Sequence, residues 1–138
     1  MLNINPKLHI DLSKARELVA LSVADRGEDY IYPYDDCVNV LQAGTNYSRG
    51  QHGGYDVFPE DKPGCLVGDA LHKAGIPLER MSSDSDAGGT LVDLEFRGMA
   101  THTREAKEWL MFLQNEQDSK RPWGQAVRDA DRFIEESN

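Results

Sequence analysis

Apolar residues recur at helical spacing between positions 65 and 75, and this stretch predicts the centre of the fold. At the helical period of about 3.6 residues, these residues fall on one broad side. They are Leu66, Val67, Ala70, Leu71 and Ala74. Turn-forming residues bound the stretch on both sides. These are Pro63, Gly64, Gly75 and Pro77. A helix this short does not persist alone in water, so we expect neighbouring elements to bury it.

Two small residues, Gly68 and Ala70, lie within this predicted central helix. A glycine inside a helix costs about 1 kcal/mol of stability relative to alanine. We therefore expect another stretch of backbone to pack closely against the helix at this position.

Three further stretches show the helical period. The first follows the capping residues Asp11 and Ser13 and ends at Gly27. The second begins at Thr103 and the third near Pro122. Because each C-terminal helix carries one tryptophan, we expect the two rings to hold these helices together. The apolar positions are Ala15, Leu18, Val19 and Ser22; Ala106, Trp109, Leu110 and Leu113; and Trp123, Ala126, Val127, Ala130, Phe133 and Ile134.

Aromatic and β-branched residues cluster on both sides of Asp35 and Asp36. They predict two short strands, at 30–34 and 37–41. The two aspartates would form the turn between them, and the result would be a short two-stranded hairpin.

A polar loop is predicted at 82–89, where serine, aspartate and glycine dominate, and we expect it to be mobile. It separates a single helical turn at 77–81 from the segment 90–96. Periodicity alone does not distinguish helix from strand in so short a segment. We interpret 90–96 as a short helix capped by Thr90.

The stretch 43–63 has no sustained periodicity, and its glycines and aromatic residues distinguish it from a plain linker. Loops this long inside a compact domain are usually functional or disordered. We favour an ordered loop that folds back over the predicted strands, and disorder of 49–54 is the alternative. Because function tends to lie on loops held by a rigid scaffold, its aromatic residues are the candidate partner-binding residues. They are Tyr47, His52, Tyr55 and Phe58.

The predicted fold is a helix-dominated α+β single domain of residues 1–138, with a two-stranded hairpin and a long irregular loop. A length of 138 residues suits one domain with a substantial core. No apolar run approaches a membrane span, and the N-terminus lacks the features of a signal peptide. Two cysteines are too few for a disulfide framework, so we expect a cytoplasmic protein with reduced thiols.

The formal net charge of −9 and the pI near 4.8 argue against direct nucleic-acid binding, which needs clustered Lys and Arg. An acidic protein can meet a basic partner surface, or imitate nucleic acid if its carboxylates gather on one face. The simplest interpretation is that the charge keeps the protein soluble.

The polar side of the central helix carries the sharpest chemical candidates. Asp69 lies four residues after Cys65 and three before His72, so it can neighbour either residue. Cys65 and His72 lie about 10 Å apart along the axis, at about 1.5 Å per residue, and cannot pair directly. A small metal- or ligand-dependent enzyme would use His72, Asp69 and His52. The alternative is that Cys65 packs as a small apolar residue while Asp69 and His72 form a surface pair.

A metal site would have to draw on carboxylates and histidine. However, adjacent aspartates are ordinary turn residues, and the sequence contains no His-Glu-x-x-His helix and no EF-hand loop. We therefore predict no catalytic residue, no cofactor and no metal site. The side chains that could act as metal ligands are Asp35, Asp36, His52, Asp56 and Asp69.

Three segments look like a recurring pattern and occur in the same order in other small proteins. They are Glu-Asp-Tyr-Ile-Tyr-Pro at 28–33, Cys-Leu-Val-Gly-Asp-Ala-Leu-His at 65–72, and 117–126 with its Trp-Gly-Gln-Ala ending. In these segments the chain resembles uncharacterised small proteins of actinobacteria and their phages. The resemblance implies a bacterial or phage cytoplasm and carries over no activity and no functional residue.

Taken together, these observations favour a non-enzymatic function. We expect a small acidic accessory protein that acts by protein–protein interaction, with the stretch 43–63 as the contact surface. A metal- or ligand-dependent enzyme and an acidic nucleic-acid mimic are the alternatives.

Overall fold

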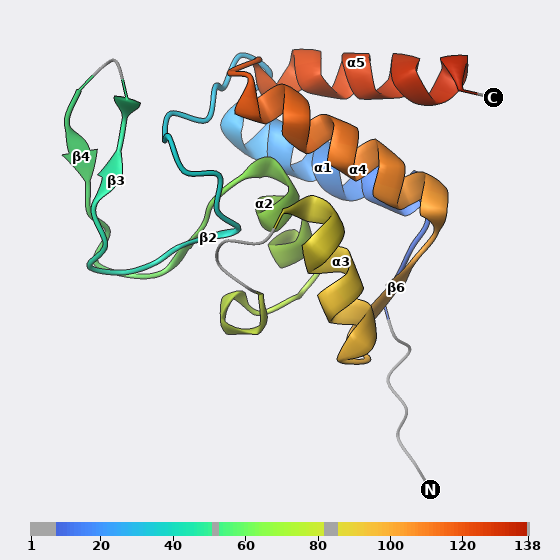
Figure 1. The fold of residues 1–138 in the computed structure, drawn as a ribbon, viewed down its shortest axis with the longest axis horizontal. Helices are drawn as coiled ribbons and strands as arrows, with labels where there is room; N and C mark the ends of the chain where they lie inside the picture. Colours follow the sequence, from blue (N-terminus) through green and yellow to red (C-terminus); the bar gives the residue numbers. More distant parts are fainter. Residues whose placement is uncertain (1–7, 51–52, 82–85, 138) are drawn as a thin grey trace, which may run out of the picture.

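The computed structural model of the chain describes residues 8–50, 53–81 and 86–137. Within these ranges the chain forms five α-helices and three two-stranded sheets, which confirms the helix-dominated α+β class. The helices gather into one body, and a hairpin arm extends from one side of it (Figure 1).

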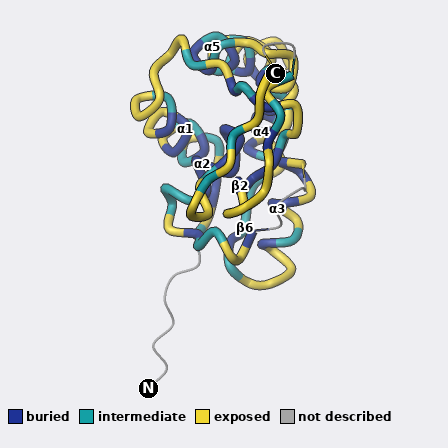
Figure 2. Tube along the Cα trace, turned by 90° about the vertical axis from the view of Figure 1, so that its left-hand side faces the viewer, coloured by how far each residue is buried: buried dark blue, intermediate teal, exposed yellow. Residues whose placement is uncertain are grey.

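The helix α2 (Leu66–Lys73) lies at the centre of the body, as its apolar pattern predicts. Cys65 is its N-cap, and Gly75, with a φ of 101°, follows its end. Every residue from Leu66 to Leu71 is buried. Figure 2 shows buried stretches on the inward sides of the surrounding helices as well. The expectation that neighbouring elements bury this helix is therefore confirmed.

The backbone of Asn39 crosses α2 at Gly68. A Cβ atom at Gly68 would lie 2.6 Å from the carbonyl oxygen of Asn39 and 2.7 Å from its Cα. Both are backbone atoms, so they cannot swing aside as a flexible side chain would. The close approach expected at Gly68 is confirmed.

Three long helices form most of the body around α2: α1 (Leu12–Arg26), α4 (Arg104–Asp118) and, one layer further out, α5 (Trp123–Glu136). α1 and α4 both pack against α2, and α5 packs against α4. α1 and α4 each begin at a polar N-cap residue. The Asp11 side chain accepts a hydrogen bond from the Lys14 amide, and the Thr103 side chain accepts one from the Ala106 amide. The predicted apolar positions of the three helices are buried or half-buried, except that Phe133 lies at the edge and stacks on Phe112.

The two tryptophans are fully buried, and only Trp109 joins the C-terminal helices through its polar edge. Its Nε1 donates to Asp131 Oδ1 of α5 at 2.9 Å. Trp123 instead packs edge-on against Tyr30, with ring centroids 4.7 Å apart, and its amide donates to the Tyr30 carbonyl at 2.8 Å. α5 is thus fixed to α4 on one side and to the segment after α1 on the other.

Two buried glutamines on α4 accept hydrogen bonds from the first amides of α2 and α3 (Ala87–Phe96). The Oε1 atom of Gln117 accepts a hydrogen bond from the Leu66 amide at 2.6 Å, and that of Gln114 accepts one from the Ala87 amide. The first amides of a helix have no partner within it. These side chains therefore satisfy N–H groups that would otherwise be unpaired inside the core.

The helix α3 begins at Ala87, earlier than the predicted start at Thr90. Asp86 caps it, since its side chain accepts a hydrogen bond from the Gly89 amide at 2.6 Å. Thr90 lies inside the helix and accepts a hydrogen bond from Asn39 Nδ2 at 2.7 Å. Of the loop predicted at 82–89, the part 82–85 lies outside the described residues.

The single turn predicted at 77–81 is present as η2 (Leu78–Arg80).

The hairpin predicted from 30–34 and 37–41 is wrong, because no strand forms at 30–34. The carbonyl oxygens of Tyr32 and Tyr34 accept hydrogen bonds from Lys120 Nζ at 3.1 and 2.6 Å. A lysine beyond the end of α4 thus takes the place of a strand partner.

The observed strands are short and pair over long distances in the sequence. β2 (Val40–Leu41) pairs antiparallel with β5 (Lys62–Pro63), with Val40 opposite Pro63. At the other end of the body, β1 (Leu8–Ile10) pairs in parallel with β6 (Ala100–His102). β6 is a strand that the hydrophobic pattern of the sequence does not predict.

The crossing at Gly68 makes a testable prediction. We expect Gly68→Ala to lower the free energy of unfolding by roughly 1–3 kcal/mol or more, because the new methyl group overlaps rigid backbone. Urea unfolding followed by circular dichroism measures this change.

Gly88→Ala is the matched control. A Cβ at Gly88, in the first turn of α3, would meet Met111 Sδ at 3.1 Å and Lys107 Cε at 3.5 Å. These are flexible side chains, so we expect little loss of stability. Equal stability of the two variants would contradict the close crossing.

Candidate interaction site

Between β2 and β5, the described residues 42–50 and 53–61 form an extended hairpin that we call the arm. β3 (Tyr47–Ser48) and β4 (Tyr55–Asp56) pair antiparallel within it, with Tyr47 opposite Asp56. The β2–β5 pair closes its base. The arm points away from the helices (Figure 1). As predicted for 43–63, it packs against the segment where strands were expected, through contacts of Tyr47 and Phe58 with Tyr34, although no strand forms at 30–34.

A cluster of aromatic rings, which we call the arm cluster, gives the arm a core of its own. Tyr34, Tyr47 and Phe58 have ring centroids between 5.9 and 6.5 Å apart. Tyr32 extends this cluster towards the helices, 5.4 Å from Tyr34. Tyr47 is 4% exposed, and its hydroxyl accepts a hydrogen bond from the Gln42 amide at 2.7 Å. These contacts join the arm to Tyr32 and Tyr34, which lie in the segment after α1 and outside the arm.

A polar contact joins the arm cluster to the two strands. The Nε and Nη2 atoms of Arg49 donate to Asp56 Oδ2 at 2.9 and 2.7 Å, and the Tyr34 hydroxyl donates to the same oxygen at 2.7 Å. The hydrogen bond from Tyr34 and the guanidinium of Arg49 lower the pKa of Asp56. Burial and the donation to Asp56 raise the pKa of Tyr34.

The outer face of the arm exposes two large side chains. Tyr55 is 70% and Val57 is 53% exposed, while Asp56 and Phe58 between and after them are only partly exposed. This is the two-residue alternation of an extended strand with one face packed and one face free. The arm therefore presents an aromatic and an aliphatic side chain from a rigid support.

The four sequence-predicted residues lie in different places. Tyr47 is buried in the arm cluster, Phe58 is half-buried against it, and Tyr55 is exposed on the outer face. His52 lies outside the described residues. Val57 was missed, although its two-residue spacing from Tyr55 is the signal that could have indicated it.

The polar residues of α2 do not gather into one site. Asp69 is 1% exposed and pairs with Lys73 at 3.3 Å. The Nδ1 atom of His72 lies 3.1 Å from the Ile76 carbonyl oxygen, beyond the C-terminal end of the helix. Cys65, at the N-terminal end, donates to Asn39 Oδ1 at 3.4 Å.

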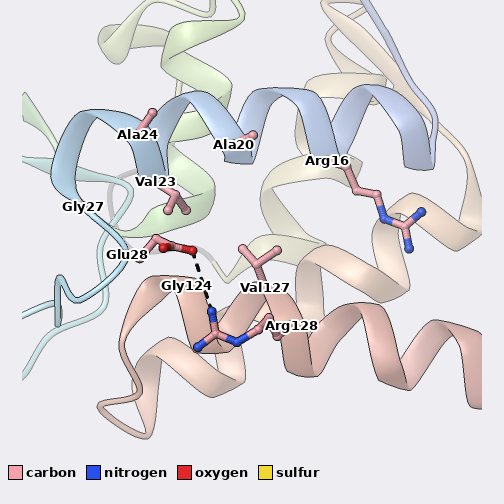
Figure 3. Close-up of a pocket in the computed structure, with 9 residues that line it drawn as sticks. All are labelled: Arg16, Ala20, Val23, Ala24, Gly27, Glu28, Gly124, Val127 and Arg128. Atoms are coloured by element: carbon pink, nitrogen blue, oxygen red, sulfur yellow. Dashed lines mark ion pairs between the residues drawn. The ribbon is translucent and has the colours of Figure 1, made fainter.

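A groove of about 510 Å³ lies between α1 and α5 (Figure 3). Val23 and Val127 point into it, and Glu28 and Arg128 face each other across one end, 3.7 Å apart. Its wall is mainly apolar and contains no histidine or cysteine. The lining residues are Arg16, Ala20, Val23, Ala24, Gly27, Glu28, Gly124, Val127 and Arg128.

No family model matches the chain, and neither a curated protein nor a solved structure is significantly similar to it. Across residues 8–50, 53–81 and 86–137, no three His, Cys, Asp or Glu side chains gather in a way that could hold a metal ion. Over the same described ranges, every helix is too short or too polar to cross a membrane.

The contact between Tyr34 and Asp56 predicts a measurable pKa change. We expect Tyr34→Phe to raise the pKa of Asp56 towards the usual value of about 3.9, because the variant removes a hydrogen bond to the carboxylate. A carbon-detected NMR titration of the aspartate carboxyl groups measures this.

The sign of the pH dependence follows. The folded arm lowers the pKa of Asp56, so this carboxylate stabilises the arm above the unfolded pKa. That contribution to stability is lost as the pH falls through the lowered pKa that Asp56 has in the folded protein. An unchanged Asp56 titration in Tyr34→Phe would contradict the contact.

Proposed function

We propose that this chain is a small acidic binding module that docks on a protein partner through the outer face of the arm. The observation that supports this most directly is a projecting arm, held by the arm cluster, that leaves Tyr55 and Val57 exposed.

Two features of the arm are typical of protein-binding surfaces: an exposed tyrosine and an ordered backbone. Tyrosine is enriched among the residues that dominate binding energy in protein interfaces. A surface that is already ordered loses less conformational entropy on binding than a flexible loop does. The arm cluster and the Arg49–Asp56 pair supply that order before any partner arrives.

The charge of the chain favours a basic partner. The net charge is −9, and complementary charge raises association rates and disfavours wrong partners. The same charge disfavours direct binding to nucleic acid. The proposed setting is the cytoplasm of an actinobacterium or of a phage-infected host, on the resemblance of the three segments quoted above.

The proposal predicts that two substitutions on the arm abolish binding without unfolding the protein. A partner would be captured from a lysate of the native host with the wild-type chain, purified, and titrated by calorimetry. We expect the double variant Tyr55→Ser, Val57→Ser to weaken binding at least about tenfold, since truncating a central aromatic contact costs about 1.4 kcal/mol or more.

A matched control variant carries Val92→Ser and Phe96→Ser. It removes one valine and one aromatic ring, 50% and 90% exposed, from α3 instead of the arm. We expect it to bind like the wild type, with both double variants melting within a few degrees of it. Loss of binding in the α3 variant alone, or unchanged binding in the arm variant, would contradict the proposal.

A further inference from the structure

The fold brings together the only two cysteines of the chain, Cys37 and Cys65. The amide of Cys65 donates to the carbonyl of Val38, the residue after Cys37, at 2.8 Å. Each cysteine shifts the pKa of the other, and the Cys65 thiol donates to Asn39 Oδ1 at 3.4 Å. Gln117 lies between the two cysteines. Its Nε2 is 3.5 Å from Cys37 Sγ, and its Oε1 accepts a hydrogen bond from the amide of Leu66, the residue after Cys65.

Hydrogen-bond donors surround both sulfur atoms. Gln114 Nε2 donates to Cys37 Sγ at 3.0 Å. Cys65 caps the N-terminus of α2, where unpaired amides and the helix dipole favour negative charge. The neighbouring Cys65 and burial raise the pKa of Cys37, whereas the neighbouring Cys37 and the amides of Gly68 and Val67 lower that of Cys65. Of the two side chains, Cys65 is therefore the one whose thiolate is favoured.

The two thiols differ in their access to solvent. Cys65 is fully buried, at 0% exposure, and Cys37 is partly exposed. Of the two cysteines, only Cys37 borders the solvent from which a reagent arrives. A buried thiol next to an accessible one is the arrangement of a resolving cysteine beside the cysteine that reacts first.

We propose that Cys37 and Cys65 are a redox-active dithiol, in which a small disulfide reacts at Cys37 and Cys65 then closes an intramolecular disulfide. This goes beyond the binding function of the arm and does not depend on it.

The reaction proceeds by two thiol–disulfide exchanges. Cys37 gives its proton to the Cys65 thiolate as its Sγ attacks one sulfur of the small disulfide, whose S–S bond breaks; one small thiolate leaves and takes that proton from Cys65. The Cys65 thiolate then attacks Cys37 Sγ, the mixed disulfide breaks, and a second small thiolate leaves. Two protein thiols are oxidised, one small disulfide is reduced, and the two protons lost by the cysteines pass to the leaving thiolates.

The product would tie the chain entering the arm to the N-terminus of α2. The arm lies entirely between the two cysteines in the sequence, so the disulfide would close a loop containing it. A closed loop restricts the unfolded chain and raises the melting temperature. Oxidation of the two cysteines would therefore fix the base of the arm, and reduction would release it.

The test treats the reduced, folded, full-length protein with oxidised glutathione. We expect the intact mass to fall by about 2 Da, for two hydrogens lost, and peptide mapping to link Cys37 to Cys65. We also expect the melting temperature to rise by roughly 5–15 °C. Dithiothreitol should reverse all three changes.

Two variants test the order of the steps. Cys65→Ser should accumulate a mixed disulfide with glutathione on Cys37, and Cys37→Ser should stay unmodified while folded. In the wild type, a stable glutathione adduct without the cross-link, or no reaction in the folded state, would overturn the proposal. The measurements on the wild type decide the test even if a serine variant fails to fold.

Discussion

The burial of the N-terminus of α2 is the constraint on which the rest of the structure depends. A helix begins with amides that have no intrahelical partner, and unpaired amides in a core cost about 1–3 kcal/mol each. Cys65, the N-cap, carries no side-chain oxygen. The carboxamide of Gln117 supplies the missing acceptor for the Leu66 amide from α4, and Gln114 does the same for α3. Three helices are thereby fixed in one arrangement.

The same junction determines where the arm leaves the body. The backbone at Asn39 passes against Gly68, and its carbonyl accepts a hydrogen bond from the Gly64 amide at 2.9 Å. This contact continues into the β2–β5 pair, which is the base of the arm. The Nε2 atoms of both glutamines reach Cys37 just before that base. Core packing, the arm and the dithiol thus share one set of contacts.

Much of the fold could be predicted from the sequence because helical periodicity is a local signal. The stripe from Leu66 to Leu71 and the caps Asp11 and Thr103 are examples. The strands could not be predicted in the same way. β1 and β6 have three residues each, and their pairing depends on chain segments far apart in the sequence.

The candidate site was only partly predictable, for a related reason. The alternation of Tyr55 and Val57 is visible in the sequence, but which face packs depends on Tyr34, outside the arm. The glutamines lie on the same helical face as Leu110 and Leu113, where apolar residues are expected. Only the structure shows which amides they satisfy.

The most direct test of the central claim is the stability of Gln117→Met. Methionine nearly preserves the volume and removes the acceptor, so the Leu66 amide would be left unpaired in the core. Urea unfolding should show a loss of about 1–3 kcal/mol, against less than about 0.5 kcal/mol for Asn115→Met on the exposed side of α4. If Gln117→Met is as stable as the wild type, the capping of α2 by α4 does not organise this fold.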